Sequence, residues 1–187
     1  MSHYHPIEPA IIDWDNGTPR CPKHGDIYFS TDGGIKETEY VFLQGNQLPQ
    51  RWQDQSSFTI AETGFGTGLN FLCTLKHWLA TAPDTARLNY ISVEKHPLTK
   101  TDLQRAITSW PELAEFGLEL IEHYPPLVHG LHQRQLFNGR VTLTLLFGDA
   151  SDMFTDINTA VDAWYLDGFA PSKNPGMWTP ELFKQIA

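Results

Sequence analysis

Cysteine is scarce in this chain: Cys21 and Cys73 are the only two among 187 residues, and they stand far apart. Such a pair does not make a disulfide framework. No apolar run approaches the length of a membrane span, and the N-terminus lacks the basic and then apolar pattern of a signal peptide. We therefore expect a globular cytoplasmic protein that does not enter a membrane.

Positive charge is also in short supply, since 13 Lys and Arg stand against 22 Asp and Glu, a formal net charge of −9. This balance argues weakly against a nucleic-acid partner, because binding to phosphates needs a positive patch. The argument is weak because local clustering of charge matters more than the sum. The hydrophobic share of 41% is ordinary for a soluble domain with a buried core.

Complete metal-ligand patterns are missing as well. Cys21-x-x-His24 and His129-x-x-His132 each resemble half of a metal site. Neither has a matching second half at convincing spacing, so we predict no metal.

From Phe58 onward, strand-like and helix-like segments alternate. The expected strands are 58–62, 88–94, 140–147 and 160–166, and the expected helices are about 68–80, about 99–110 and one from 179 onward. This alternation predicts parallel β-α-β units and a doubly wound α/β sheet. The intervening stretch 112–137 is expected to be helical in parts and broken at Pro125-Pro126.

Residues 1–56 differ from the rest because they are rich in turns. β-compatible pieces at 26–30 and 39–43 predict a small β-rich extension, packed on a core domain at 57–187. Only four strands are visible in the core, and its last helix has barely begun at Ala187. We therefore expect the core to be incomplete at its C-terminus.

The most informative segment joins the first core strand to the helix that follows. After Glu62 come Gly64, Gly66 and Gly68 at alternate positions, just before an apolar run. Glycine accepts positive φ and has no Cβ, so a flat cofactor can lie against the backbone there. An acid two residues before the first glycine would repel a phosphate. It suits S-adenosylmethionine, which carries an ammonium and a sulfonium.

In doubly wound sheets, ligands bind beyond the carboxyl ends of the strands. Acids stand at all four such places: Glu62, Glu94, Asp149 and Asp167. Glu94 fits a ribose clamp or is a surface glutamate in a turn. Asp149 could accept a hydrogen bond from an adenine amino group, cap the next helix, or do both.

The loop 167–178 (DGFAPSKNPGMW) is the second strong signal, because an acid at a strand end leads into Gly, Pro and aromatic residues. It predicts a site for a planar substrate beside a carboxylate that handles an amine. The alternative is a rigid structural loop with one solvated aspartate.

Four segments together resemble the methyltransferase domain of the MnmC family of tRNA 5-methylaminomethyl-2-thiouridine biosynthesis proteins. They are 26–30 (DIYFS), 37–43 (ETEYVFL), 64–72 (GFGTGLNFL) and 167–178. The resemblance covers nearly the whole chain and implies a class I S-adenosylmethionine-dependent methyltransferase fold. It further implies methyl transfer to the aminomethyl group of a wobble uridine of tRNA. FAD belongs to a fused oxidase domain that follows in the bifunctional proteins, so we do not predict it here.

The residues and the resemblance together lead to a hypothesis for the roles of single residues. The cofactor-binding residues are expected to be Glu62, Gly64, Phe65, Gly66, Gly68, Asn70, Glu94 and Asp149. Tyr28, Phe29, Phe169, Pro171 and Lys173 are expected to contact the substrate, with the aromatic rings near the base or the sulfonium. Asp167 is the predicted catalytic residue, which orients the attacking amine and takes up or relays its proton.

Two other functions remain open from the residues. One is an NAD-dependent oxidoreductase, although its turn requires G-x-G-x-x-G and Asn70 and Phe71 stand where a third glycine would fall. The other is a methyltransferase-like scaffold without activity, against which the four acids argue.

Overall fold

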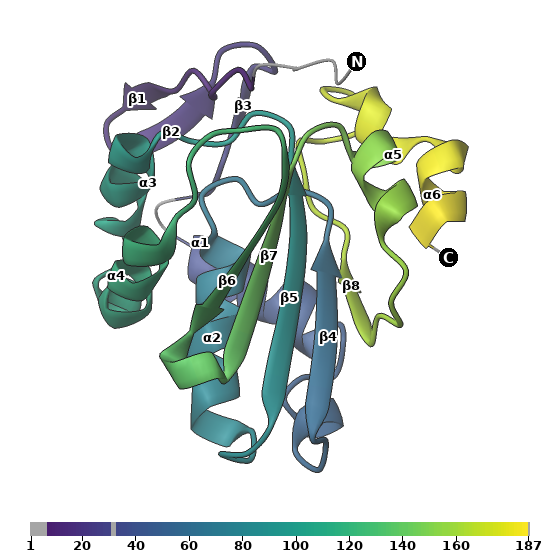
Figure 1. Cartoon of the computed structure of the whole chain (residues 1–187). Coiled ribbons are helices and arrows are strands. Elements are labelled where there is room, and N and C mark those ends of the chain that lie inside the picture. Colours follow the sequence, from purple (N-terminus) through teal and green to yellow (C-terminus); the bar gives the residue numbers. More distant parts are fainter. Residues whose placement is uncertain (1–6, 31–32, 187) are drawn as a thin grey trace.

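A computed structural model describes residues 7–30 and 33–186, and its centre is a five-stranded sheet (Figure 1). The strands are β4 (Ser57–Glu62), β5 (Arg87–Glu94), β6 (Gly130–Leu136), β7 (Val141–Phe147) and β8 (Ala163–Tyr165). Their order across the sheet is β6-β7-β5-β4-β8. β7, β5, β4 and β8 run parallel, as predicted, and their carboxyl ends therefore lie at one edge of the sheet.

Helices cover both faces of the sheet and bury two separate cores (Figure 1). They are α2 (Leu69–Thr81), α3 (Lys100–Ile107), α4 (Ala114–His123), α5 (Ala150–Met153) and α6 (Pro180–Ile186). Ile60 belongs to the larger core with α2 to α4, and the next residue, Ala61, belongs to the smaller core with α5 and α6. This alternation follows from the period of two along a strand, and it makes the fold a three-layered α/β domain.

The antiparallel strand β6 differs from the predicted all-parallel arrangement. It pairs with β7 at the edge of the sheet, within the stretch 112–137 that the sequence marked as mixed. The expected helical part is α4, which ends at His123 just before Pro125-Pro126.

The N-terminal extension contains short strands only in its first part, at residues 13–27. β1 (Asp13–Asp15), β2 (Thr18–Cys21) and β3 (Asp26–Ile27) form a small antiparallel sheet above the carboxyl ends of the central strands (Figure 1). The predicted β piece at 39–43 is wrong, because α1 (Gly34–Thr38) continues into a π-helix over Glu39–Gln44. Thr38 and Leu43 turn inward there and Tyr40 stays exposed, so packing against α2 overrides the β propensity of the segment.

The shorter elements are single helical turns. They lie at Gln50–Trp52, Pro111–Leu113, Phe137–Gly139, Phe154–Asp156 and Pro175–Trp178. Within the described residues, no helix combines the length and apolarity that crossing a bilayer would require. Of the two units expected at 1–56 and 57–187, residues 1–6, 31–32 and 187 lie outside the described residues.

Candidate functional site

The glycine turn after β4 has the conformation that the sequence predicts. Gly66 and Gly68 have φ of +51° and +75°, in the left-handed region that favours glycine. The N–H of Phe65 donates to the carbonyl of Val93 at 3.1 Å, which ties the turn to β5. Gly68 then caps the N-terminus of α2. The turn is thus held open, with backbone rather than side chains at its surface.

A cavity of about 780 Å³ lies beside this turn, between the strand ends and the N-terminal extension. Ten of the predicted site residues line it: Tyr28, Phe29, Gly64, Phe65, Gly66, Asn70, Glu94, Asp149, Asp167 and Phe169. Four others, Glu62, Gly68, Pro171 and Lys173, lie outside its lining. The sheet topology therefore brings residues from five distant parts of the chain to one place.

Glu94 ends β5 and is fixed by the backbone around it. Its Oε2 accepts a hydrogen bond from the N–H of Gly66 at 2.8 Å, and its Oε1 accepts one from the N–H of His96 at 2.9 Å. Burial raises the pKa of Glu94, and these backbone hydrogen bonds oppose that effect. Glu94 also lines the cavity, where a carboxylate oxygen can accept a hydrogen bond from a ligand hydroxyl.

Asp149 caps α5, because its Oδ1 accepts a hydrogen bond from the N–H of Ser151 at 3.0 Å. Its Oδ2 lies 2.8 Å from Nζ of Lys95. Burial would raise the pKa of Asp149, but the hydrogen bond and charge of Lys95 and the bonds from Ser151 outweigh it, so this pKa is lowered. The capping alternative is therefore realised, and contact with an adenine remains a prediction.

Asp167 follows β8 and faces the cavity from the opposite side of the glycine turn. Its Oδ1 accepts from the N–H of Gly168 at 2.7 Å, and its Oδ2 accepts from the side-chain amide of Asn70 at 2.6 Å. Burial raises the pKa of Asp167, opposed by these two hydrogen bonds and reinforced by the charge of Glu37. A carboxylate with a raised pKa is a better proton acceptor.

Glu62 lies beneath the cavity rather than on its wall. Its side chain is 1% exposed, accepting hydrogen bonds from Oγ of Ser92 at 2.7 Å and from the Asn70 amide at 2.9 Å. Burial raises the pKa of Glu62 to about 8, with a further contribution from Asp167. Glu62 therefore reaches the cavity only through Asn70.

The aromatic candidates occupy different positions. Tyr28 and Phe169 meet edge to face, with ring centroids 5.2 Å apart, on the cavity wall. Phe29 is mostly buried against Trp110, with centroids 4.5 Å apart. Nζ of Lys173 lies 3.4 Å from the carbonyl of Gly25, so this lysine joins the loop to the N-terminal extension and does not line the cavity.

Two residues that no sequence pattern indicated, Thr38 and Ser92, hold Asn70 and Glu62 in place, and Thr38 itself lines the cavity. Thr38 donates a hydrogen bond to Oδ1 of Asn70 at 2.8 Å, and Ser92 donates to Glu62. Thr38 lies in the segment 37–43 that shows the family resemblance. Because a strand was expected at 39–43, the inward orientation of the Thr38 side chain was not predicted.

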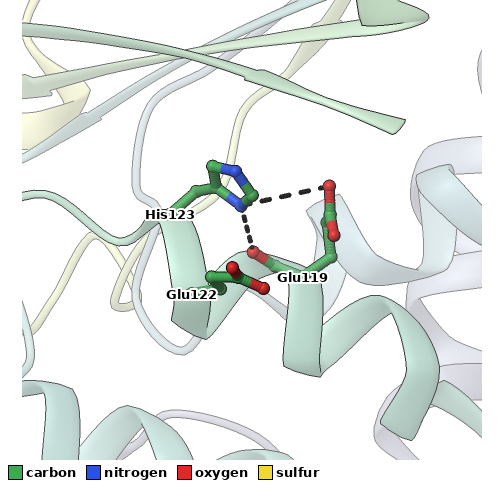
Figure 2. A group of neighbouring side chains, drawn as sticks. All are labelled: Glu119, Glu122 and His123. Carbon is green, nitrogen blue, oxygen red and sulfur yellow. Dashed lines mark hydrogen bonds and ion pairs between the residues drawn. The ribbon is translucent and has the colours of Figure 1, made fainter. Parts of the chain in front are cut away.

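A separate group of possible metal ligands lies on α4 (Figure 2). Glu119, Glu122 and His123 bring their ligand atoms within 4.8 Å of one another, and no other such group occurs among residues 7–30 and 33–186. Oε1 of Glu119 already accepts from the N–H of Phe137 at 3.0 Å, and Nδ1 of His123 bonds the Glu119 carbonyl. The two half-site patterns of the sequence, Cys21/His24 and His129/His132, do not belong to it.

The cavity is suited to a cationic ligand. Within the described part of the chain, neither Glu94 nor Asp167 makes an ion pair, although both line the cavity beside bare glycine backbone. Uncompensated carboxylates attract a positive ligand group in a partly desolvated site. These features fit S-adenosylmethionine.

Comparison with known proteins agrees with this interpretation. A family model described as S-adenosyl-L-methionine-dependent methyltransferase matches residues 111–187. The tRNA 5-methylaminomethyl-2-thiouridine biosynthesis bifunctional protein MnmC of Marinobacter nauticus is 50% identical over 186 residues, which cover 96% of this chain and 30% of that protein. The protein of the same name from Pseudomonas syringae pv. syringae is 51% identical over 182 residues, which cover 95% of this chain and 27% of that protein.

A solved structure shares the fold. The crystal structure of MNMC2 from Aquifex aeolicus matches with a TM-score of 0.70 and 29% identity, covering 98% of this chain and 57% of that one. The predicted fold class is therefore confirmed. The chain spans about 30% of the length of the curated relatives it matches.

Proposed function

Since this chain is homologous over nearly its whole length to one part of the MnmC proteins, we propose that it is their tRNA methyltransferase domain. It would transfer a methyl group from S-adenosylmethionine to the amine of 5-aminomethyl(-2-thio)uridine at the wobble position, giving the 5-methylaminomethyl form. The observation that carries the proposal is the pair of uncompensated carboxylates, Glu94 and Asp167, on either side of the glycine turn.

When bound, S-adenosylmethionine supplies an electrophilic methyl group on a sulfonium. The chain would hold it with the backbone of Gly64 to Gly66, which leaves room for its amino-acid part. Glu94 would accept hydrogen bonds from the ribose hydroxyls with its free lone pairs. Asp149 would lie near the adenine, and the Phe65 and Asn70 side chains would complete this half of the cavity.

The other half of the cavity would take the modified base. Tyr28 and Phe169 offer ring faces and edges to a planar group, and Phe29 supports the wall from behind. Pro171 would stiffen the loop, and Lys173 would meet the RNA outside the cavity rather than the base.

Asp167 would orient the attacking amine, which must be neutral. Its carboxylate accepts a hydrogen bond from one amine N–H, which directs the nitrogen lone pair toward the methyl group. The product is a secondary ammonium, and its excess proton passes to Asp167 or to solvent. The raised pKa of Asp167 favours this uptake.

The structure weakens the oxidoreductase alternative. A dinucleotide turn uses its backbone N–H groups to bind a pyrophosphate. Here the N–H of Gly66 is already bound by the Glu94 carboxylate, and a phosphate would be repelled at that place. Methyl transfer to tRNA by the purified protein would exclude the inactive-scaffold alternative.

The partners follow from the proposed reaction. They are tRNA, the methyl donor and a fused oxidase domain in the remaining length of the relatives, and FAD would bind only in that further domain. A tRNA substrate implies a cytoplasmic site of action.

Calorimetry and an activity assay test the proposal together. We expect S-adenosylhomocysteine, but not NADH, to bind the protein. We also expect the protein to convert 5-aminomethyluridine to 5-methylaminomethyluridine in tRNA from a strain lacking this step, as seen by mass spectrometry of nucleosides. Asp167→Asn should lower turnover about a hundredfold or more and change S-adenosylhomocysteine affinity little. NADH binding, or cofactor binding without any methyl transfer, would contradict the proposal.

A further inference from the structure

We propose that Thr38 is a positioning residue for Asp167, which fixes the side-chain amide of Asn70 so that Asp167 stays charged and aimed into the cavity. Only the effect of Thr38 on catalysis rests on the proposed function. It is carried by a chain of hydrogen bonds that links the N-terminal extension to the strand ends.

Asn70 is the centre of this chain. Its amide nitrogen donates to Oε1 of Glu62 at 2.9 Å and to Oδ2 of Asp167 at 2.6 Å. An asparagine amide has two N–H donors, so both are used. Its Oδ1 accepts the hydroxyl hydrogen of Thr38 at 2.8 Å. Thr38 and Asn70 are only 4% and 6% exposed, so water has little access to replace these bonds.

Thr38 selects between the two orientations of the amide. In the observed orientation, both N–H groups face carboxylates and the oxygen faces the hydroxyl donor. Rotation of the amide by half a turn would set its oxygen against Glu62 and Asp167 and its nitrogen against Thr38. The hydroxyl of Thr38 therefore further stabilises the orientation in which the Asn70 amide donates to Asp167.

The surroundings of Asp167 make this support important. The titratable groups that bear on it are acids from three elements: Glu37 on α1, Glu62 on β4 and Glu94 on β5. The phenol of Tyr90 lies below Glu62 and carries no positive charge. Because Asp167 makes no ion pair among residues 7–30 and 33–186, its charge depends on two donors, the N–H of Gly168 and the amide of Asn70.

The helix α1 thus contributes to the site in two ways, because Gly34, Glu37 and Thr38 line the cavity and Thr38 also acts through Asn70. Thr38 is the last residue of α1, and α1 packs on α2, which carries Asn70 near its start. A change at Thr38 would reach Asp167 through one intervening side chain. We infer that this part of the N-terminal extension helps to set the protonation of the site as well as to cover it.

The test measures the titration of Asp167 directly by ¹³C NMR of aspartate side-chain carboxyls, assigned with Asp167→Asn. Thr38→Val keeps the shape of the side chain but cannot donate, and Thr38→Ser keeps the donor. We expect Thr38→Val to raise the pKa of Asp167 by about half a pH unit or more, because its hydrogen bond from Asn70 weakens. Thr38→Ser should titrate like the unaltered protein.

A double-mutant cycle separates an effect through Asn70 from a general one. In an Asn70→Ala background, Thr38→Val should leave the titration of Asp167 unchanged. The inference is overturned if Thr38→Val does not move that titration, if Thr38→Ser moves it equally, or if the effect persists without Asn70.

This outcome does not depend on the reaction. The titration is read from the free protein, so a failure of methyl transfer would refute the proposed function and leave the Thr38 inference standing. Conversely, an unmoved titration would refute the role of Thr38 whatever the protein catalyses. If both hold, the acid limb of the pH profile of methyl transfer should move upward with Thr38→Val and return with Thr38→Ser.

Discussion

The backbone N–H of Gly66 donates a hydrogen bond to the Glu94 carboxylate at 2.8 Å. The bond joins the middle of the glycine turn to the end of the neighbouring strand β5. It holds Glu94 in place before any ligand arrives, so little conformational entropy is lost when the carboxylate binds. The same bond removes one backbone donor from the turn, which separates this site from a phosphate-binding one.

Glu94→Gln tests the predicted ribose clamp. A glutamine keeps the shape but loses the charge, and one of its ends presents N–H groups toward the backbone donors of Gly66 or His96. We expect affinity for S-adenosylhomocysteine to fall about tenfold or more, measured by calorimetry. Glu122→Gln, at an exposed position on α4, is the matched control and should bind normally. Equal affinities in both variants would exclude Glu94 from the cofactor site.

Gly64 and Gly68 should respond differently to alanine. A Cβ at Gly68 would lie 3.1 Å from Cζ of Phe65, at a φ of +75°, whereas a Cβ at Gly64 would meet its nearest atom, the Asp167 carbonyl oxygen, at 3.4 Å. Gly68→Ala combines left-handed strain with overpacking and should cost about 1–3 kcal/mol of unfolding free energy.

Urea denaturation and calorimetry distinguish the two positions. Gly64→Ala should change the stability by only about 0.5 kcal/mol or less, because its backbone is unstrained. It should nevertheless weaken S-adenosylhomocysteine binding, since the new methyl group stands at the cavity wall. A Gly64→Ala protein that binds normally would show that the ligand does not approach this backbone.

Most of the parallel sheet could be predicted because its strands are apolar in sequence and an acid stands at or just after the end of each one. β7 was visible from its Val, Leu and Phe content, whereas β6 was not, because His132 and Arg134 give an edge strand a polar sequence. Residues 39–43 have β-forming side chains and were predicted as a strand, but tertiary packing makes them helical.

The sequence predicted that the acids at the strand ends lie close together. It did not predict how deeply each carboxylate is buried. Glu62 shares its strand face with Ile60, which belongs to the core under α2, so the pleat turns its carboxylate inward. Asn70, the second residue of α2, then meets it. Such contacts depend on how the strand and the helix pack, which no single segment of sequence specifies.

The buried Glu62 should make stability depend on pH. Its pKa is raised to about 8 in the folded protein, so between about pH 4.5 and 8 the folded state binds more protons than the unfolded state. Its contribution to stability is therefore present at low pH and is lost as the pH rises through this window. Glu62→Gln removes the effect, so its stability relative to the unaltered protein should increase by about 2–4 kcal/mol from pH 5 to 8.

Urea unfolding at several pH values measures this difference. Glu115→Gln replaces an exposed glutamate on α4 and should run parallel to the unaltered protein over the same range. A constant difference between Glu62→Gln and the unaltered protein would mean that Glu62 is ionised in the folded state at neutral pH.

Lys173 should contribute to RNA binding through charge alone. Its Nζ lies 3.4 Å from the carbonyl of Gly25, and within the described residues it has no carboxylate partner. A lysine that neutralises one phosphate releases about one counterion, so Lys173→Gln should reduce the salt slope of tRNA affinity by about one. Lys184→Gln removes the same charge from an exposed position on α6, outside the cavity lining, and should keep the slope. The salt slopes are measured by filter retention of tRNA between low and moderate salt. A slope for Lys173→Gln equal to that of the unaltered protein would place the RNA away from the 167–178 loop.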